Sequence, residues 1–332
     1  MRLFQLALLA IPFVLFAPGC GEKKIVRYSY DKLYMSTHFE VVIYTSKGES
    51  FANEAAYAGF AEAARLDKKF STTDPESLIT RLNRNGGGEL DPETAEILST
   101  SAKFYHMSGE LFDVTVLPLV RLWGFIDEQY RLPATNEIRE TLNKVSFTNV
   151  IIENGKVTLK NGAMLDFGAI AKGFAIDKLV QVLQSNGISS GLVNAGGNLQ
   201  VFGDKPDGTL WKIGIKNPRE DGKIYQTVEL KSGLSIATSG DYERFFITNG
   251  IRYHHILNPK TGWSMRNGVA SVSVIVGNGE LSDVLSTSLF LLGPDKGIGY
   301  AESNRLPVLY IMDTNGQLQE RKSSFWQAAS MN

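Results

Sequence analysis

The first candidate site is the segment Asp166–Gly173, which has the carboxylate of Asp166 at one end and Lys172 near the other. The hydrophobic pattern of Val157–Leu165 predicts a strand before this segment, and that of Phe174–Leu183 predicts an amphipathic helix after it. Such a junction exposes free backbone N–H groups and the positive end of a helix dipole, which suit an anionic ligand. Asp166 could then bind a polar ligand and Lys172 a phosphate. Asp166 could equally cap the helix while Lys172 is solvated, and the segment alone leaves both interpretations open.

A second candidate site is the pair Asp283 and Thr287, four residues apart at the start of a helix expected over Asp283–Leu292. This spacing puts a carboxylate and a hydroxyl on one helix face. With a loop carbonyl they would suit a hard cation such as Mg²⁺. Without other information, the same pair is commonly only a helix start.

Histidines offer a third kind of chemistry. His254 and His255 precede Asn258–Gly262, a loop by its proline and glycine. A histidine there could act as a base or orient a hydroxyl nucleophile, and a partly buried structural histidine is the alternative. The four histidines are too scattered for a zinc site of standard spacing, and the sequence contains no G-x-S-x-G or Walker A motif.

The elements that must position these residues mix helical and β patterns, which favours an α+β fold with mostly antiparallel strands over a doubly wound sheet. Asp113 is conspicuous because an ionised carboxylate in the apolar stretch Glu110–Phe125 needs a partner. Further helices are expected at Asn53–Phe70 and Asp91–Met107, and strands or hairpins at Met35–Tyr44, Asn149–Leu159, Gly191–Phe202, Trp211–Ile215, Tyr225–Leu230, Leu234–Thr238, Arg244–Thr248, Tyr253–Leu257, Val269–Val276 and Val308–Met312.

Composition and the N-terminus indicate an exported globular protein. The chain has 332 residues, 43% of them hydrophobic, and a net charge of −1, which gives no electrostatic case for nucleic acid binding. Arg2 precedes an apolar run that ends just before Cys20, the only cysteine, as in an export signal with a bacterial lipoprotein box. We expect a signal peptide over 1–19, lipidation of Cys20, a polar tether over 20–30 and a catalytic domain over 31–332.

Taken together, these stretches resemble the ApbE family of flavin transferases, the FAD:protein FMN transferases. The matching stretches follow the family's order and cover nearly the whole chain after the tether. They are Met35–Thr37, Ser71–Asn83, Phe112–Val116 through Trp123–Phe125, Asp166–Gly173, Asn194–Asn198, Ala237–Tyr242, His255–Gly262 and Asp283–Leu289.

The resemblance implies a T-fold-like α+β core with mixed or antiparallel sheets, flanking helices and an FAD cleft. It assigns Mg²⁺ to the Ala169 carbonyl, Asp283 and Thr287, with Ser286 close enough to contribute, and it makes His255 the base for an incoming hydroxyl. By the same resemblance, FAD is bound by Met35, Thr73, Leu111, Phe112, Asp113, Asp166, Lys172 and Leu257.

The reaction implied is attack by a threonine hydroxyl of an acceptor protein on the FAD diphosphate, which links FMN to the acceptor by a phosphoester and releases AMP. Acceptors in the family are flavin subunits of Rnf and Nqr redox complexes, which fits an exported, lipid-anchored enzyme facing the periplasm. An FAD pyrophosphatase and a non-enzymatic periplasmic FAD-binding lipoprotein are the alternatives.

Two positions depart from the family pattern. Thr73 stands where the family often has a tyrosine that contacts the flavin, which predicts weaker FAD binding. Asn258 stands where the family normally has an aspartate, which removes a charge near His255.

Overall fold

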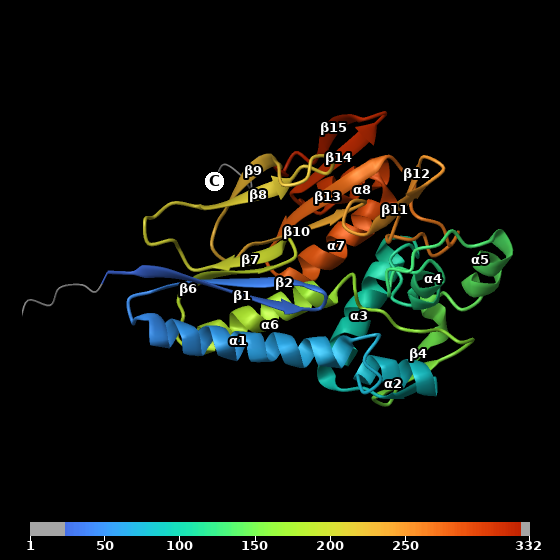
Figure 1. Ribbon diagram of the computed structural model, residues 1–332, viewed down its shortest axis with the longest axis horizontal. Coiled ribbons are helices and arrows are strands. Elements are labelled where there is room, and N and C mark those ends of the chain that lie inside the picture. The colour runs from blue at the N-terminus through green and yellow to red at the C-terminus, as the bar shows by residue number, and fades with distance from the viewer. Residues whose placement is uncertain (1–23, 327–332) are drawn as a thin grey trace, which may run out of the picture.

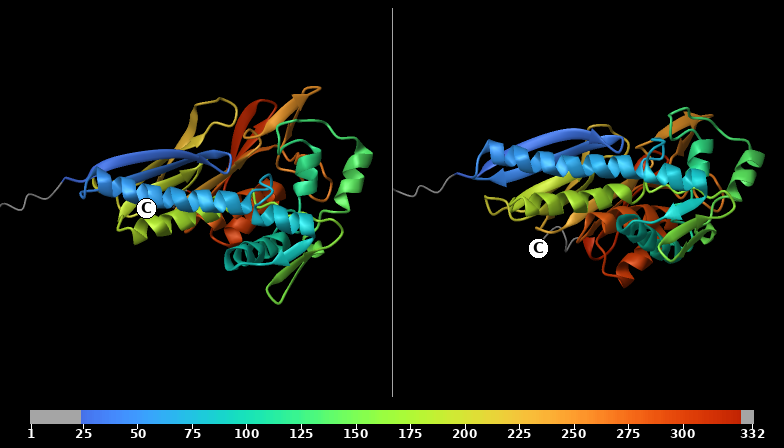
Figure 2. Two further views of the ribbon diagram at one scale, coloured as in Figure 1. Left: turned by 60° about the horizontal axis from the view of Figure 1, so that its bottom comes forward. Right: turned by 90° about the horizontal axis from the view of Figure 1, so that it is seen from below.

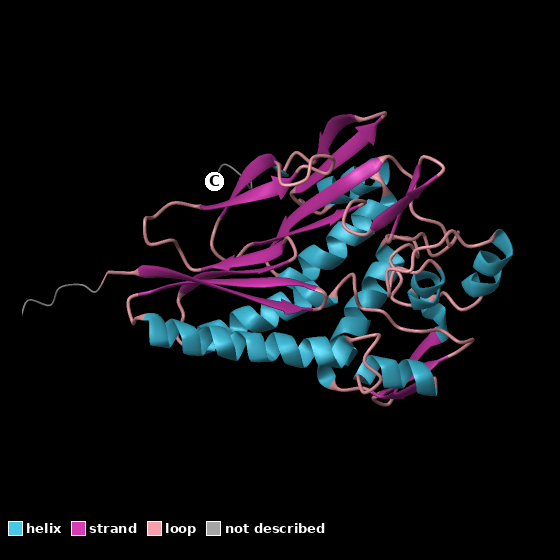
Figure 3. Ribbon diagram, in the orientation of Figure 1, coloured by secondary structure: helices cyan, strands magenta, loops and turns pink. Residues whose placement is uncertain are grey.

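The computed structural model describes residues 24–326, and its centre is an eight-stranded sheet in which every neighbouring pair is antiparallel (Figures 1 and 3). Together with the helices around it, this sheet confirms the α+β prediction. In order across the sheet the strands are β1 (Val26–Tyr34), β2 (Thr37–Thr45), β6 (Ser190–Ala195), β7 (Asn198–Phe202), β10 (Ser235–Gly240), β13 (Val269–Val276), β14 (Val308–Thr314) and β15 (Gln317–Lys322).

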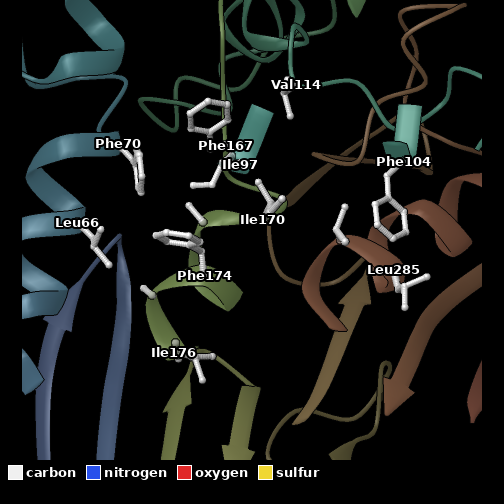
Figure 4. Close-up of a cluster of buried hydrophobic side chains, with 14 of the residues drawn as sticks. Leu66, Phe70, Ile97, Phe104, Val114, Phe167, Ile170, Phe174, Ile176 and Leu285 are labelled. Atoms are coloured by element: carbon white, nitrogen blue, oxygen red, sulfur yellow. The ribbon is translucent and has the colours of Figure 1, made fainter. Parts of the chain in front are cut away.

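One face of the sheet is covered by helices α1 (Glu49–Phe70), α6 (Ala171–Ser185) and α7 (Gly279–Leu292). Helices α1 and α6 run side by side, as both views of Figure 2 show. Several buried positions of α1 are alanines, which have no long side chain to hold the two helices apart. Figure 4 shows the larger side chains that fill the core, with Phe70 of α1, Phe174 of α6 and Leu285 of α7 among them.

The opposite face of the sheet is covered by the ribbon of β8 (Trp211–Lys216) and β9 (Ile224–Leu230). Leu199 and Ile236 point to this ribbon, and their neighbours Asn198 and Ser235 make hydrogen bonds to α7 on the helix side. The strands β7 and β13 are therefore buried on both faces, which explains the nearly continuous apolar run of β13.

The other elements gather mainly at the end of the molecule away from the β1–β2 hairpin (Figure 1). Helix α4 and the β11–β12 ribbon share an aromatic cluster with Trp123, Phe125, Phe246 and Tyr253 at its centre. The bounds are α2 (Leu78–Asn85), β3 (Gly87–Glu89), α3 (Pro92–Met107), α4 (Leu117–Leu122), α5 (Thr135–Leu142), the 3₁₀ helix η1 (Phe147–Asn149), β4 (Val150–Glu153), β5 (Lys156–Leu159), β11 (Phe245–Thr248), β12 (Ile251–His254) and α8 (Pro294–Ser303).

Several expected boundaries were wrong; for example, α1 begins at Glu49 instead of Asn53, and β12 ends at His254 instead of Leu257. The end of the expected tether, from Val26 to Tyr30, belongs to β1, where Tyr28 and Tyr30 pack against the core. The strand expected over Val157–Leu165 stops at Leu159, because Asn161 and Gly162 form a turn with φ of 54° and 73°. Helix α7 begins at Gly279, one turn before the expected start.

The expected signal peptide and Cys20 lie outside the described residues. Within residues 24–326, no helix is both long enough and apolar enough to cross a membrane.

Candidate active site

The candidate site is built where α6 crosses α7 at two glycines. A Cβ atom on Gly173 would lie 2.1 Å from the Gly279 carbonyl oxygen, so a side chain there would hold the helices apart. Asp177 ties the crossing together, because its carboxylate accepts the N–H groups of Gly279 and Glu280 at 2.6 and 2.8 Å. The crossing brings the first turn of α6 against Asp283 of α7.

Both carboxylate oxygens of Asp283 are held by N–H donors. The Gly173 backbone N–H donates to Oδ2 at 2.9 Å, and the Asn198 side-chain amide donates to Oδ1 at 2.8 Å. Asp283 is only 3% exposed, so it is part of the packed helix crossing. Gly173 lies in the first turn of α6, where N–H groups lack helical partners, and Asp283 therefore satisfies one of them.

The hydroxyls predicted to accompany Asp283 lie on the next turn of α7. The Ser239 hydroxyl of β10 lies 2.9 Å from both the Ser286 and the Thr287 hydroxyl. Ser286 is fully buried and donates to the Asp283 carbonyl, whereas Thr287 is partly exposed. Ala169, which is partly exposed, lies just before the first turn of α6.

Asp166 and Lys172 organise the loop that leads into α6. The Asp166 side chain accepts the Gly168 N–H at 2.7 Å, and Lys172 donates to the Gly168 carbonyl at 3.2 Å. Asp166 does not cap the helix, because the N-cap residue of α6 is Ile170, whose side chain makes no capping hydrogen bond. Both side chains are partly exposed and shape a loop at a helix N-terminus.

The segment Leu111–Asp113 lies beside this loop, because the Asp166 N–H donates to the Val114 carbonyl at 2.7 Å. Asp113 has the partners its environment requires: Thr115 donates to Oδ1 through its N–H and hydroxyl, and Phe147 donates its N–H to Oδ2. Burial nevertheless raises the pKa of the Asp113 carboxyl above its usual range.

The loop after β12 closes against Leu111–Asp113. Glu110 and Lys260 form an ion pair at 2.9 Å, and a cavity of about 200 Å³ lies beneath, lined by Asp113, Ser146 and Pro259 among others. Asn258 supports this loop, because its side-chain oxygen accepts the N–H groups of Lys260 and Thr261 as an aspartate would. Leu257 is buried beside the loop, at 5% exposure.

His255 is poised as a neutral base. Its Nδ1 lies 3.3 Å from the Arg244 carbonyl, which can only accept, so Nδ1 carries the proton and Nε2 keeps its lone pair. Burial lowers the pKa of His255 well below its usual range, and the positive charge of Arg244 lowers it further.

His254 has a different role. It donates from Nε2 to the Met265 carbonyl at 2.8 Å and is 4% exposed, so it is a structural histidine.

Thr73 and Met35 lie on two further turns. Thr73 is exposed, and its hydroxyl lies 3.1 Å from that of Ser71. Arg121 of α4 holds this turn by donating to the Thr72 carbonyl at 3.1 Å. Met35 has a positive φ of 50° between β1 and β2 and packs against the core. No hydrogen bond described within residues 24–326 joins the Met35 side chain to Asp283 or His255.

The arrangement therefore combines an oxygen-rich corner at the α6–α7 crossing, a helix N-terminus with a lysine, and a neutral histidine. Among the residues that the structure describes, no three His, Cys, Asp or Glu side chains are grouped to hold a metal, so any cation here must rely on hydroxyl, carbonyl or ligand oxygens as well. Such a corner suits a cation shared with a phosphate-bearing ligand.

Sequence reasoning included Asn198 and Ser239 in stretches that match the family but gave neither residue a role in this corner. Each is a polar residue that faces the helices, Asn198 from the buried strand β7 and Ser239 from β10. That polar character was the available signal.

The chain is similar to known proteins over most of its length. The model of the ApbE family matches residues 35–310. The FAD:protein FMN transferase of Vibrio cholerae is 32% identical over 265 residues, which cover 78% of this chain and 79% of the relative. That of Haemophilus influenzae is 30% identical over 336 residues, which cover 96% of each. The crystal structure of the ApbE protein of Thermotoga maritima superposes with a TM-score of 0.85 at 33% identity, and the match covers 92% of this chain and 100% of the Thermotoga chain. The apo flavinyl transferase ApbE of Pseudomonas stutzeri gives 0.83 at 28% identity, with 92% and 97% covered.

Proposed function

The chain belongs to the ApbE family and is a flavin transferase, and we propose that it moves FMN from FAD to a threonine hydroxyl of an acceptor protein with the help of Mg²⁺. The new bond joins the threonine oxygen to the phosphorus of the FMN half. The bond that breaks joins this phosphorus to the oxygen that leaves with AMP. The observation that carries the proposal is the α6–α7 crossing, where the carboxylate of Asp283 meets the N-terminus of α6.

The donor atoms at this crossing fit Mg²⁺. The carboxylate of Asp283, the hydroxyl of Thr287 and the carbonyl of Ala169 are all hard oxygen ligands, and Ser286 lies beside them. A bound Mg²⁺ would neutralise the charge that develops on the diphosphate. A single carboxylate gives weak affinity alone, so the diphosphate of FAD would supply further oxygens and tighten binding.

His255 would accept the threonine proton, because its Nε2 is unprotonated and its lowered pKa keeps the ring neutral at pH 7. Lys172 and the positive end of the α6 helix dipole would hold the diphosphate. These groups position the reactants and stabilise charge, which is how proteins accelerate transfer of a phosphoryl-type group.

The remaining residues would shape the FAD cleft. Leu111, Asp166, Met35 and Thr73 present partly exposed or exposed groups. Phe112 and Leu257 are buried at 2% and 5% exposure, so they would form its wall and contribute backbone groups. The carboxylate of Asp113 already accepts hydrogen bonds from Thr115 and Phe147, so Asp113 would fix the shape of the segment around it.

We also propose that the enzyme is exported and anchored to a bacterial membrane through a lipid on Cys20, facing the periplasm. Strand β1 begins at Val26, six residues later, and six extended residues span at most about 20 Å. The domain would then work close to the membrane, where flavin subunits of Rnf- or Nqr-type complexes would be the acceptors.

One incubation separates this proposal from its alternatives. The purified protein is mixed with FAD, Mg²⁺ and a threonine-bearing acceptor domain. Flavin fluorescence that stays on the denatured acceptor supports transfer. Free FMN and AMP without labelled acceptor would indicate a pyrophosphatase. Intact FAD would indicate binding alone.

A further inference from the structure

A polar seam joins α7 to the sheet beneath it. On the helix-facing side of β7 and β10, Asn198, Ser235 and Ser239 make side-chain hydrogen bonds to α7. They meet α7 turn by turn: Ser235 lies 2.9 Å from Ser282, Asn198 bonds Asp283, and Ser239 reaches Ser286 and Thr287. The cation ligands proposed above are thus held from the sheet side by side chains that would not themselves touch the cation.

The hydrogen bonds of Asn198 fix the orientation of its amide. The backbone N–H of Thr238 can only donate, and it donates to Asn198 Oδ1 at 3.2 Å. The oxygen is therefore committed, and Nδ2 must face Asp283, to whose Oδ1 it donates at 2.8 Å. Because Asn198 is 4% exposed, water cannot easily replace it. The carboxylate of Asp283 is held between this amide and the Gly173 N–H.

The hydroxyls form a chain with only one consistent direction. Ser286 donates its single proton to the Asp283 carbonyl at 2.9 Å, so its oxygen must accept from Ser239. Ser239 then has no proton left and must accept from Thr287. The Thr287 hydroxyl thereby donates its proton to Ser239, and both lone pairs of the Thr287 hydroxyl oxygen remain free. A hydroxyl with free lone pairs is what a cation requires of a neutral ligand.

From this seam we propose that Asn198 and Ser239 are positioning residues of the cation site, the first for the Asp283 carboxylate and the second for the Thr287 hydroxyl. The proposal deepens the proposed function and rests on its metal site. It also distinguishes the two hydroxyls: Thr287 is the ligand, while the fully buried Ser286 passes hydrogen bonds along the chain.

The test measures cation binding directly. Mn²⁺ serves as the probe, and the signal of free Mn²⁺ in electron paramagnetic resonance gives its affinity with and without FAD. Substitutions that remove partners of metal ligands typically weaken metal binding about 10- to 100-fold. We expect such a loss for Asn198→Ala and for Ser239→Ala, at temperatures where both variants are folded.

Ser235→Ala is the matched control. It removes a buried hydrogen bond of the same seam, between β10 and α7, but its partner Ser282 is no cation ligand. Its melting temperature should fall while its Mn²⁺ affinity stays at the wild-type value. If Asn198→Ala fails to fold, Ser239→Ala still tests the proposal, because Ser239 is only partly buried.

Each outcome has a distinct meaning. Wild-type Mn²⁺ affinity in Asn198→Ala and Ser239→Ala would overturn the positioning roles while leaving the metal site standing. An equal loss in Ser235→Ala would also overturn them, because general loosening of the seam would then explain the effect. If the wild-type protein binds no Mn²⁺ even with FAD, the metal site itself fails, and the positioning roles fail with it.

Discussion

The α6–α7 crossing makes Gly173→Ala the most revealing single substitution. The added Cβ would lie 2.1 Å from the Gly279 carbonyl oxygen and 2.7 Å from the Asp283 Cβ, whereas ordinary contacts begin at 3.4 Å. The obstacles are backbone and the stem of a ligand residue, so α7 must move by about 1 Å. That movement also stretches the 2.9 Å bond from the Gly173 N–H to Asp283.

The free-energy terms can be compared. Overpacking typically costs about 1–3 kcal/mol. Weakening a hydrogen bond to a charged group costs about 1.5–3 kcal/mol. Replacing a helical glycine by alanine returns at most about 1 kcal/mol. The destabilising terms therefore exceed the stabilising one, and we expect the free energy of unfolding to fall by about 2–5 kcal/mol.

Urea unfolding followed by tryptophan fluorescence measures this loss, and Mn²⁺ binding at low temperature measures the displacement of Asp283. Gly299→Ala in α8 is the control, because its Cβ would meet nothing within 4 Å, and it should stabilise the protein by about 0.5–1 kcal/mol. A Gly173→Ala protein with wild-type stability and wild-type Mn²⁺ affinity would refute the view that this close crossing builds the site.

Three substitutions and two conditions test the remaining groups. Asp283→Ala should abolish transfer, as should EDTA on the wild type, and full transfer in either case would exclude the metal assignment. Asp283→Ala should also destabilise the fold, because the Gly173 N–H and the Asn198 amide lose a buried acceptor, at about 1–3 kcal/mol each, which urea unfolding would detect. His255→Asn should lower kcat about 10²- to 10⁴-fold with FAD affinity unchanged, so a normal kcat would remove His255 as the base. Thr73→Tyr should tighten FAD binding by about 1–3 kcal/mol in a fluorescence titration if the ring stacks on the flavin, and an unchanged affinity would count against stacking. Burial lowers the pKa values of His254 and His255 in the folded protein. Below about pH 6.5 the unfolded chain therefore takes up protons at these histidines that the folded protein does not, and the free energy of unfolding falls as the pH falls. Above that pH, the two histidines contribute to stability in full. Melting temperatures that stay constant from neutral to mildly acidic pH in the wild type would contradict this.

Local patterns in the sequence were sufficient to predict most of the fold. The β-branched run Val269–Val276 coincides with β13. The hairpin expected over Asn149–Leu159 is formed by β4 and β5, which are joined by a turn with positive φ at Asn154 and Gly155. β1 was missed because its charged and polar residues read as a tether, whereas alternate tyrosines pack on the core. β15 was missed because its residues are almost all exposed and polar, and only pairing with β14 makes it a strand.

For the site, sequence reasoning identified side chains but not their surroundings. Spacing alone put Asp283 and Thr287 on one face of a helix, and they do share α7. It could not show that Asp283 is buried against Gly173, since this contact joins residues 110 positions apart. The partners of Asp283 and Thr287 on β7 and β10 depend on the order of strands in the sheet, which no local pattern encodes.

The central claim is that the threonine oxygen of an acceptor displaces AMP from FAD. It is tested most directly by measuring AMP release and acceptor-bound flavin in the same reaction, with chromatography for AMP and intact mass for the acceptor. The account predicts that the two products form in equal amounts, that the flavin maps to one threonine, and that both products disappear in Asp283→Ala. AMP released without flavin on the acceptor, or flavin attached without AMP, would contradict it.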